Sequence, residues 1–184
     1  MISEKLEEAE NFCTTLGLHK SFLSELYNEG SDWVFIIKTD ALHETTCREL
    51  IYKSLFFKLP TKKIKQSIPN KFIQKLAFDG RSCVLDLLKE SGCPEDHVNF
   101  IKAIRKIRNF YAHNIRNVEL SIFELIKAKS KTSELTSLMA VNPKNYNLKD
   151  FLNDIEKDSK LLRNHIFMET LRFMTLSSLI LKTE

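Results

Sequence analysis

The clearest indication of the fold is one stretch of sequence, NFIKAIRKIRNFYAHN, at residues 99–114. At about 100° per residue, its large apolar side chains fall on one arc of a helix, and most of its charged side chains fall on the other side. The apolar set is Phe100, Ile104, Ile107, Tyr111 and Ile115. The pattern predicts an amphipathic helix over residues 95–112.

The composition favours helices throughout the chain. The 184 residues include 25 Leu and 16 Ile, but only 5 Val, 4 Gly and 4 Pro. So few turn-forming residues and so little β-branched valine argue against a β-sandwich, a β-barrel or a Rossmann-type fold. A chain of this length can bury a proper core as one domain. We therefore expect a single all-α domain over residues 1–184.

Apolar side chains recur at helical spacing in five further segments of the chain. The predicted helices cover residues 3–28, 33–58, 71–89, 95–112 and 118–129, followed by one long or slightly broken helix after Asn147. Residues 59–70 are predicted to form a basic surface loop, and residues 130–147 an irregular insertion. The layout predicts an up-and-down bundle of four or five helices, with the irregular insertion before a long C-terminal helix.

The charge balance is that of an ordinary soluble protein, with 28% charged residues and a mean hydropathy of -0.23. A net charge of +4 permits a polyanionic partner such as RNA without requiring one. The longest apolar run near the C-terminus is too short to span a bilayer. The first ten residues carry five charges, four of them acidic, whereas a signal peptide begins basic and then turns apolar. We therefore expect a cytoplasmic protein that makes no membrane contact.

No motif in the sequence predicts a cofactor or a metal ion. The four cysteines are widely spaced and form no CxxC pair: Cys13, Cys47, Cys83 and Cys93. Most of them are expected to be buried as small apolar side chains. His43 and Cys47 supply only two metal ligands at helical spacing, so a solvated helix face is the better interpretation. His19 and His97 are expected at the surface. Glycine-rich phosphate loops and nucleophile elbows are absent.

Arg108 is unusual because its projected direction lies inside the apolar arc of the predicted helix. An arginine in that position must extend to solvent, pair with a carboxylate, or face a groove or a partner subunit. Asp40 and Glu44, on the second predicted helix, are the candidate carboxylates. The sequence leaves these alternatives open.

His113 ends the same predicted helix, with Asn109 one turn before it. A basic row lies beside it: Lys102, Arg105 and Lys106. An imidazole that titrates near neutral pH can move protons at a phosphodiester, and arginine can stabilise the additional negative charge of pentacovalent phosphorus. Arg108, Asn109 and His113 are therefore a candidate metal-free ribonuclease site. The structural alternative is that His113 stabilises the helix dipole and Asn114 caps the chain end.

The hexapeptide RNFYAH, at residues 108–113, resembles the R-x4–6-H motif of the HEPN superfamily, in the form in which a polar residue follows the arginine. Within that superfamily the chain is most similar to the mannitol operon repressor (MtlR-type) proteins. The similarity lies in EGSDW (29–33), LHETTCRELI (42–51) and FIQKLAFDGRSCVLDLL (72–88). It covers residues 29–116, about half of the chain, and residues after 130 match no family.

The resemblance implies a metal-independent endoribonuclease in which two motifs face each other across a homodimer. His113 would be the general base or acid, Arg108 the phosphate clamp, and Asn109 the residue that orients His113 or the phosphate. Asp40 and Glu44 would be polar partners of this pair. Such a dimer would also explain an arginine within an apolar arc. The protein would be a toxin or a defence effector held by an antitoxin partner.

Basic residues near the motif, together with those in the predicted loop, are candidate contacts to the RNA backbone. They are Lys102, Arg105, Lys106, Arg116, Lys62 and Lys63. The alternative function is that of a non-catalytic MtlR-like transcriptional regulator that acts through protein–protein interaction. Such a binder would tolerate changes at His113 and expose an apolar patch on the C-terminal helix. A direct DNA-binding repressor is disfavoured because no helix-turn-helix pattern is present.

Overall fold

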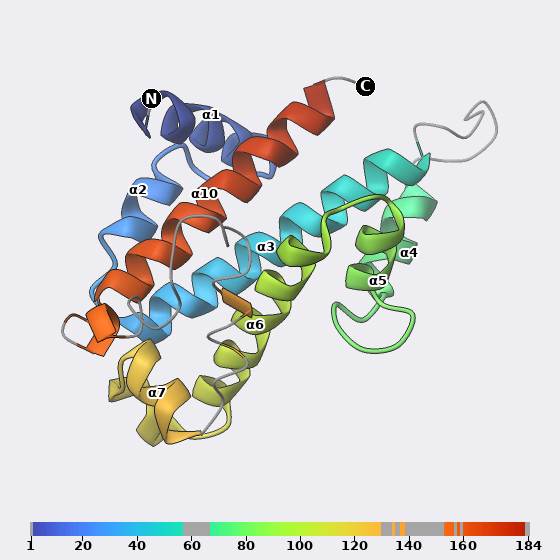
Figure 1. Cartoon of the computed structure of the whole chain (residues 1–184). Helices are drawn as coiled ribbons and strands as arrows, with labels where there is room; N and C mark the ends of the chain where they lie inside the picture. Colours follow the sequence, from blue (N-terminus) through green and yellow to red (C-terminus); the bar gives the residue numbers. More distant parts are fainter. Residues whose placement is uncertain are drawn as a thin grey trace.

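The computed structural model describes residues 2–56, 67–129, 134, 137–138, 153–156, 158 and 160–182. All regular structure in these residues is helical, which confirms the prediction of an all-α bundle (Figure 1). In chain order the helices are α1 (Ile2–Thr15), α2 (Phe22–Tyr27), α3 (Asp32–Phe56), α4 (Ser67–Lys75), α5 (Val84–Glu90), α6 (Glu95–Ala112), the 3-10 helix η2 (Ile115–Glu119), α7 (Ile122–Ala128) and α10 (Lys160–Lys182).

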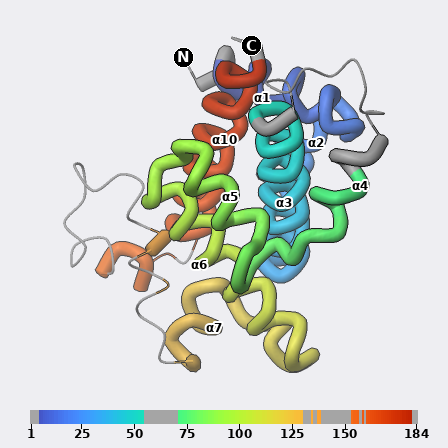
Figure 2. The backbone as a smooth tube through the Cα atoms, turned by 90° about the vertical axis from the view of Figure 1, so that its right-hand side faces the viewer, coloured from blue at the N-terminus to red at the C-terminus, as the bar shows by residue number. Residues whose placement is uncertain are grey.

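Three long helices, α3, α6 and α10, form the centre of the bundle, and α3 packs against both of the others. Helix α1 lies along α10, and α4 and α5 cover one end of α3 (Figures 1 and 2). Helix α7 packs against α6 and α10 at the other end of the bundle. As a result α3 contacts neighbours on several sides, and several of its polar side chains are buried.

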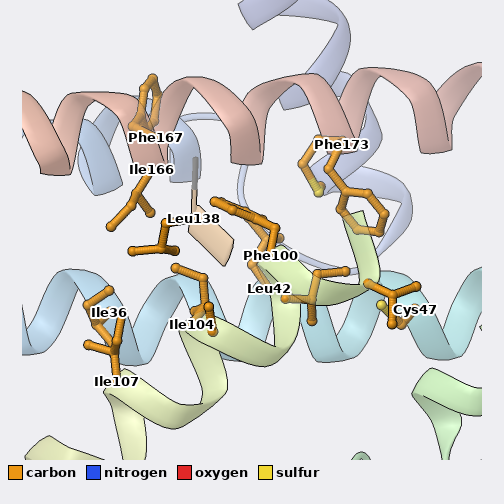
Figure 3. Packing of buried hydrophobic residues seen from close by; sticks show 14 of the residues in the cluster. Ile36, Leu42, Cys47, Phe100, Ile104, Ile107, Leu138, Ile166, Phe167 and Phe173 are labelled. Atoms are coloured by element: carbon orange, nitrogen blue, oxygen red, sulfur yellow. The ribbon is translucent and has the colours of Figure 1, made fainter. Parts of the chain in front are cut away.

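The apolar arc of α6 forms part of the core, as its spacing predicts. Phe100, Ile104, Ile107 and Tyr111 are each at most 1% exposed. Phe100, Ile104 and Ile107 pack among side chains of α3 and α10 (Figure 3). Ile115 does not follow the pattern, because the chain leaves the α-helix at His113 and Ile115 is 76% exposed. The arc therefore ends one turn earlier than predicted.

The predicted helix over residues 3–28 is two helices, α1 and α2. Gly17 has a φ of 81°, which is the left-handed conformation that glycine adopts at no steric cost. The Leu18 N–H donates to the Cys13 carbonyl at 3.0 Å, and the Gly17 N–H donates to the Thr14 carbonyl at 3.1 Å. This is the Schellman arrangement, so Gly17 ends α1 rather than bending it.

The predicted helix over residues 71–89 is also divided, into α4 and α5. Between them, Gly80 and Ser82 have positive φ angles of 124° and 52°. The turn is closed by the Val84 N–H, which donates to the Ala77 carbonyl at 2.9 Å. Apolar spacing continues across the break, and for this reason the sequence pattern concealed it. Helix α4 begins at Ser67, inside the predicted loop over residues 59–70.

The α-helix that follows α6 is shorter than predicted. The segment predicted as a helix over 118–129 is η2 followed by α7, and a reciprocal capping box of Ser121 and Glu124 begins α7. Most of the predicted insertion over 130–147 lies outside the described residues. Helix α10 supplies the long C-terminal helix. Within the part of the chain that the structure describes, no helix has the length and apolarity needed to cross a membrane.

Candidate functional site

His113 lies at the C-terminal end of α6, where it is the last residue bonded into the helix. Its backbone N–H donates to the Asn109 carbonyl at 3.0 Å, and its side chain is exposed. The side chain of Asn114 then accepts a hydrogen bond from the Arg116 N–H at 3.0 Å and begins η2. Among the described residues, no side chain bonds to the His113 imidazole. Both ring nitrogens are therefore open to a ligand from solvent.

Arg108 and Asn109 are joined by a hydrogen bond from the Arg108 Nη1 to the Asn109 Oδ1, at 3.0 Å. Asn109 is four residues before His113, so the two side chains lie on the same face of α6. Arg108 begins on a different face, and the bond to Asn109 turns its guanidinium towards the face that His113 shares. The three predicted catalytic residues are thus gathered at one end of α6, without a direct contact between Arg108 and His113.

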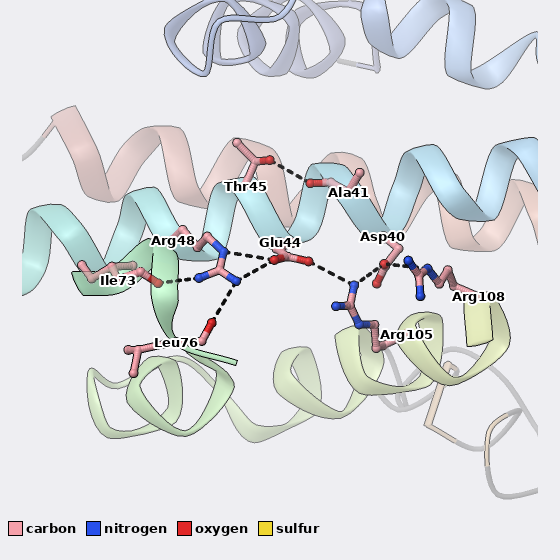
Figure 4. Close-up of polar contacts among 9 residues, drawn as sticks. All are labelled: Asp40, Ala41, Glu44, Thr45, Arg48, Ile73, Leu76, Arg105 and Arg108. Atoms are coloured by element: carbon pink, nitrogen blue, oxygen red, sulfur yellow. Dashed lines mark hydrogen bonds and ion pairs between the residues drawn. The ribbon is translucent and has the colours of Figure 1, made fainter. Parts of the chain in front are cut away.

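A chain of ion pairs connects this end of α6 to α3 (Figure 4). Asp40 accepts a hydrogen bond from Arg105 Nη1 at 2.5 Å, and its Oδ2 lies 3.7 Å from Arg108 Nε. Arg105 also donates to Glu44 at 3.1 Å. Of the alternatives that the sequence leaves open for Arg108, the structure shows the pairing with Asp40. The side chain also remains 39% exposed.

The other end of the ion-pair chain is anchored to α4. Arg48 pairs with Glu44 at 2.6 Å, and it also donates to the carbonyl oxygens of Ile73 and Leu76, at 2.5 and 3.2 Å. Ile73 lies in the last turn of α4, where its carbonyl also accepts from the Leu76 N–H at 3.2 Å, and Leu76 directly follows the helix. Arg48 therefore joins α3 to α4 and fixes one side of Glu44.

Asp40 is only 3% exposed, and burial raises the pKa of its carboxyl group, an effect that the charges of Arg105 and Arg108 oppose. The guanidinium of Arg105 also lies over the ring of Phe78, 4.9 Å from its centroid. These contacts hold Arg105 from two sides. Asp40 Oδ1 is buried without a hydrogen-bond partner, so this carboxylate is not fully satisfied by its neighbours.

The ion-pair chain carries a surplus of positive charge when both carboxylates are ionised, because three arginines face two carboxylates. The exposed fraction of the arginine side chains rises along the chain, from 11% for Arg48 to 20% for Arg105 and 39% for Arg108. The surplus is therefore most accessible at Arg108, the member beside Asn109. This arrangement can bind an anion next to the His113 imidazole.

Comparisons with known proteins found no relative of this chain. No family model matches it, and no curated protein or solved structure matches it. The function is therefore inferred from the site itself.

The residues predicted to contact RNA differ in how exposed they are. Arg105 projects on the side of α6 opposite the apolar arc, but carboxylates on α3 draw its guanidinium into the interface between the two helices. Lys106 is exposed and lies 3.5 Å from Glu134, Lys102 is partly buried, and Arg116 is exposed. The two loop residues, Lys62 and Lys63, lie outside the described residues.

The expectation of a solvated position for His43 was wrong. The side chain is 0% exposed, and its ring packs against Phe100 and Phe173 with centroids 5.7 and 5.6 Å apart. Neither ring nitrogen has a hydrogen-bond partner, and burial lowers the pKa of His43 to about 3. A signal was present in the sequence, because His43 is seven residues from both Ile36 and Leu50, which are also buried.

His97 is half-buried rather than at the surface. Its ring lies 6.1 Å from the ring of Phe173, and its Nδ1 is buried without a hydrogen-bond partner. Burial lowers the pKa of this imidazole below its usual value. No group of three or more His, Cys, Asp or Glu side chains could hold a metal ion among the residues that the structure describes.

Proposed function

We propose that this protein is a metal-independent endoribonuclease of the HEPN type, with Arg108, Asn109 and His113 as its site. The observation that supports this most is the hydrogen bond from Arg108 to Asn109, one helical turn before an exposed imidazole. A cation and a proton-transfer group at this separation can both reach one phosphodiester. RNA carries such a phosphodiester beside a 2′-hydroxyl, which can serve as the nucleophile.

In the proposed reaction, His113 accepts the proton of the 2′-hydroxyl as the 2′-oxygen forms a bond to the adjacent phosphorus. The bond from phosphorus to the 5′-oxygen breaks, and the products are a 2′,3′-cyclic phosphate and a 5′-hydroxyl. The departing 5′-oxygen takes its proton from water or from a second copy of the motif. Arg108 pairs with the non-bridging oxygens as their charge increases, and Asn109 orients Arg108.

The charges around the motif favour an RNA partner. The ion-pair chain holds the Nε edge of the Arg108 guanidinium beside Asp40 and leaves the side chain partly exposed. Lys106 and Arg116 add exposed positive charge on the two sides of His113 along the chain. Neutralising phosphates with such side chains releases counterions, so we expect RNA affinity to fall as the salt concentration rises.

A homodimer is part of the proposal, and Ile115 supports it. This large apolar side chain is 76% exposed only two residues after His113. A second copy of the chain would cover it and bring a second motif near the first. We expect Ile115→Glu to reduce both the dimer fraction in sedimentation and the rate of RNA cleavage. An Ile115→Glu variant that remains a fully active dimer would contradict the proposed homodimer interface. An antitoxin or another regulatory protein would restrain such an enzyme in a cell.

The experiment that tests the proposal is cleavage of bulk cellular RNA in EDTA by the wild-type protein, His113→Ala and His19→Ala. His19 is a matched control because it is also an exposed histidine. It lies between α1 and α2 and is not part of the candidate site. We expect the wild type and His19→Ala to cut RNA and to leave cyclic phosphate ends, and His113→Ala to lose the activity. Equal cleavage by all three proteins, or by none, would overturn the assignment.

The second candidate function is a non-catalytic regulator that acts by binding another protein. The observation that favours it is a group of exposed apolar side chains near the C-terminal end of α10, Leu176, Leu179 and Ile180, with Leu161 also exposed at the start of the helix. A surface of this kind is typical of protein–protein contacts. A regulator would bind its partner equally well with His113→Ala and lose the partner with Leu179→Glu. If the protein is a ribonuclease, His113→Ala should lose RNA cleavage and Leu179→Glu should keep it.

A further inference from the structure

A cavity of about 370 Å³ lies between α3, the turn that joins α5 to α6, and α10. Its lining includes Ser54 from α3, Ser91 and His97 from the α5–α6 region, and Phe173 and Leu176 from α10. The volume is within the range of small-molecule sites. None of these residues belongs to the candidate ribonuclease site at the other end of α6.

Among the described residues the lining contains no Asp, Glu, Lys or Arg side chain, and most of it is apolar. A charged ligand would therefore leave water without gaining an opposite charge, which is costly. Cys93 also contributes to the lining, and burial raises the pKa of its thiol to about 11, so that group is neutral as well. The cavity is suited to an uncharged molecule.

The serine hydroxyls of the lining determine the polarity of such a ligand. Ser91 donates its proton to the Leu88 carbonyl at 2.7 Å, and Ser177 donates to the Phe173 carbonyl at 2.7 Å. Ser54 donates in the same way, to a carbonyl one turn before it, at 3.3 Å. A hydroxyl has a single proton, so each of these oxygens can only accept a further hydrogen bond.

His97 adds a neutral hydrogen-bonding group to the same lining. Its Nδ1 is buried without a partner, which leaves Nε2 as the accessible nitrogen of the ring. A neutral imidazole can present an unprotonated nitrogen, and in that tautomer it also accepts a hydrogen bond. The three serine oxygens, together with His97 Nε2 in that tautomer, thus favour a ligand that donates a hydrogen bond.

We propose that this cavity binds an uncharged, largely apolar small molecule that carries a hydroxyl or N–H donor. The apolar part lies against Phe173 and Leu176, and the donor reaches a serine oxygen or His97 Nε2. The site is separate from the RNA site, and its existence does not depend on whether the protein cleaves RNA.

The test uses 2-naphthol and its matched ether, 2-methoxynaphthalene, which differ in the presence of the donor. Titration of the ¹⁵N-labelled protein, followed by NMR, should give saturable shifts at the amides of Cys93, His97 and Ser177 with 2-naphthol. The ether should bind about tenfold more weakly, the factor expected for one hydrogen bond. No saturable binding of 2-naphthol, or equal affinity for the two compounds, would overturn the proposal.

Two variants locate the site, and a third is the control. Leu176→Trp fills the mouth of the cavity and should weaken 2-naphthol binding at least tenfold. Ser177→Ala removes one acceptor, keeps the apolar lining and should weaken binding about threefold. Leu179→Trp adds the same ring on α10 at a position that does not line the cavity, and it should bind as the wild type does. Unchanged affinity in both Leu176→Trp and Ser177→Ala would place the ligand elsewhere and contradict the proposal.

Discussion

Two neighbouring faces of α3 differ in the partners that they give to polar side chains. On one face Asp40, Glu44 and Arg48 follow one another at four-residue spacing, and each is paired with an opposite charge. On the next face His43 is equally buried but has no hydrogen-bond partner, and it packs against the ring of Phe173. Burial is nearly complete on both faces for Asp40 and His43, at 3% and 0% exposed.

The two faces differ in whether neighbouring charges oppose the effect of burial on the pKa of the buried group. Asp40 has two arginines within 4 Å, and they oppose the effect of burial on its pKa. His43 has no such partner, and the charge of His97 adds to the effect of burial in keeping it neutral. One face of α3 can therefore support a charged site at the end of α6, whereas the other acts as core.

The largest expected effect comes from removing the carboxylate that joins the two helices. Asp40→Ala leaves Arg105 partly buried without its closest partner, and the variant should lose about 3 kcal/mol or more of unfolding free energy. Urea denaturation measures this loss. Glu156→Ala is the control, because its pair with Lys127 is exposed on both sides and should contribute little. An Asp40→Ala midpoint as high as that of the control would contradict the role given to the ion pairs.

The next largest effect should be a loss of stability in acid, and its source is His43 on the other face of α3. The folded-state pKa of His43 is about 3 against 6.5 for a free imidazole, so the unfolded chain binds more protons between these values. Stability from the neutral ring is complete above pH 6.5 and is lost as the pH falls, by roughly 3 kcal/mol at pH 4. His97 contributes in the same direction.

The measurement is urea denaturation at several pH values between 4 and 7 for the wild type, His43→Leu and His19→Leu. We expect His43→Leu to lose less stability than the wild type as the pH falls. The exposed control His19→Leu should follow the wild type. Identical pH dependence in all three proteins would show that the His43 face is not the source of acid sensitivity.

A smaller contrast separates the two arginines of α6. Arg105 is held by two carboxylates and the ring of Phe78, so Arg105→Ala should cost about 2 kcal/mol. Arg108 is more exposed, and its nearest carboxylate distance is 3.7 Å, so Arg108→Ala should cost less than about 1 kcal/mol. RNA cleavage should respond in the reverse order, with the greater loss in Arg108→Ala at matched folded fraction. A larger loss of stability in Arg108→Ala than in Arg105→Ala would contradict the contrast.

The sequence predicted the parts of the fold that depend on one helix at a time. The bounds of α6, Glu95–Ala112, agree with the prediction, because its apolar period and its acidic first turn both act locally. The breaks at Gly17 and Gly80 were missed because apolar spacing continues on both sides of each turn. Only the backbone angles of these glycines distinguish a turn from a tolerated glycine within a helix.

The sequence pointed to Arg108 and Asp40 as members of one candidate site, but it did not predict how the charged side chains around them connect. Arg108 and Asp40 were recognised as a possible pair, because an arginine in an apolar arc needs a carboxylate. The sequence could not show that Arg105 turns to the same carboxylate, since that depends on which side of α6 faces α3. The burial of His43 was missed for the same reason, because a single helix does not reveal how many neighbours surround it.

The most direct test of the central claim is the cleavage rate of one defined RNA and of its 2′-deoxy copy, measured in EDTA. The wild-type protein and His113→Ala are compared, each confirmed by circular dichroism to be folded. We expect the wild type to cut only the RNA, and His113→Ala to be at least about a hundredfold slower, as for the loss of a general acid or base. Cleavage of the RNA by His113→Ala at the wild-type rate, or cleavage of the 2′-deoxy strand by the wild type, would contradict the account.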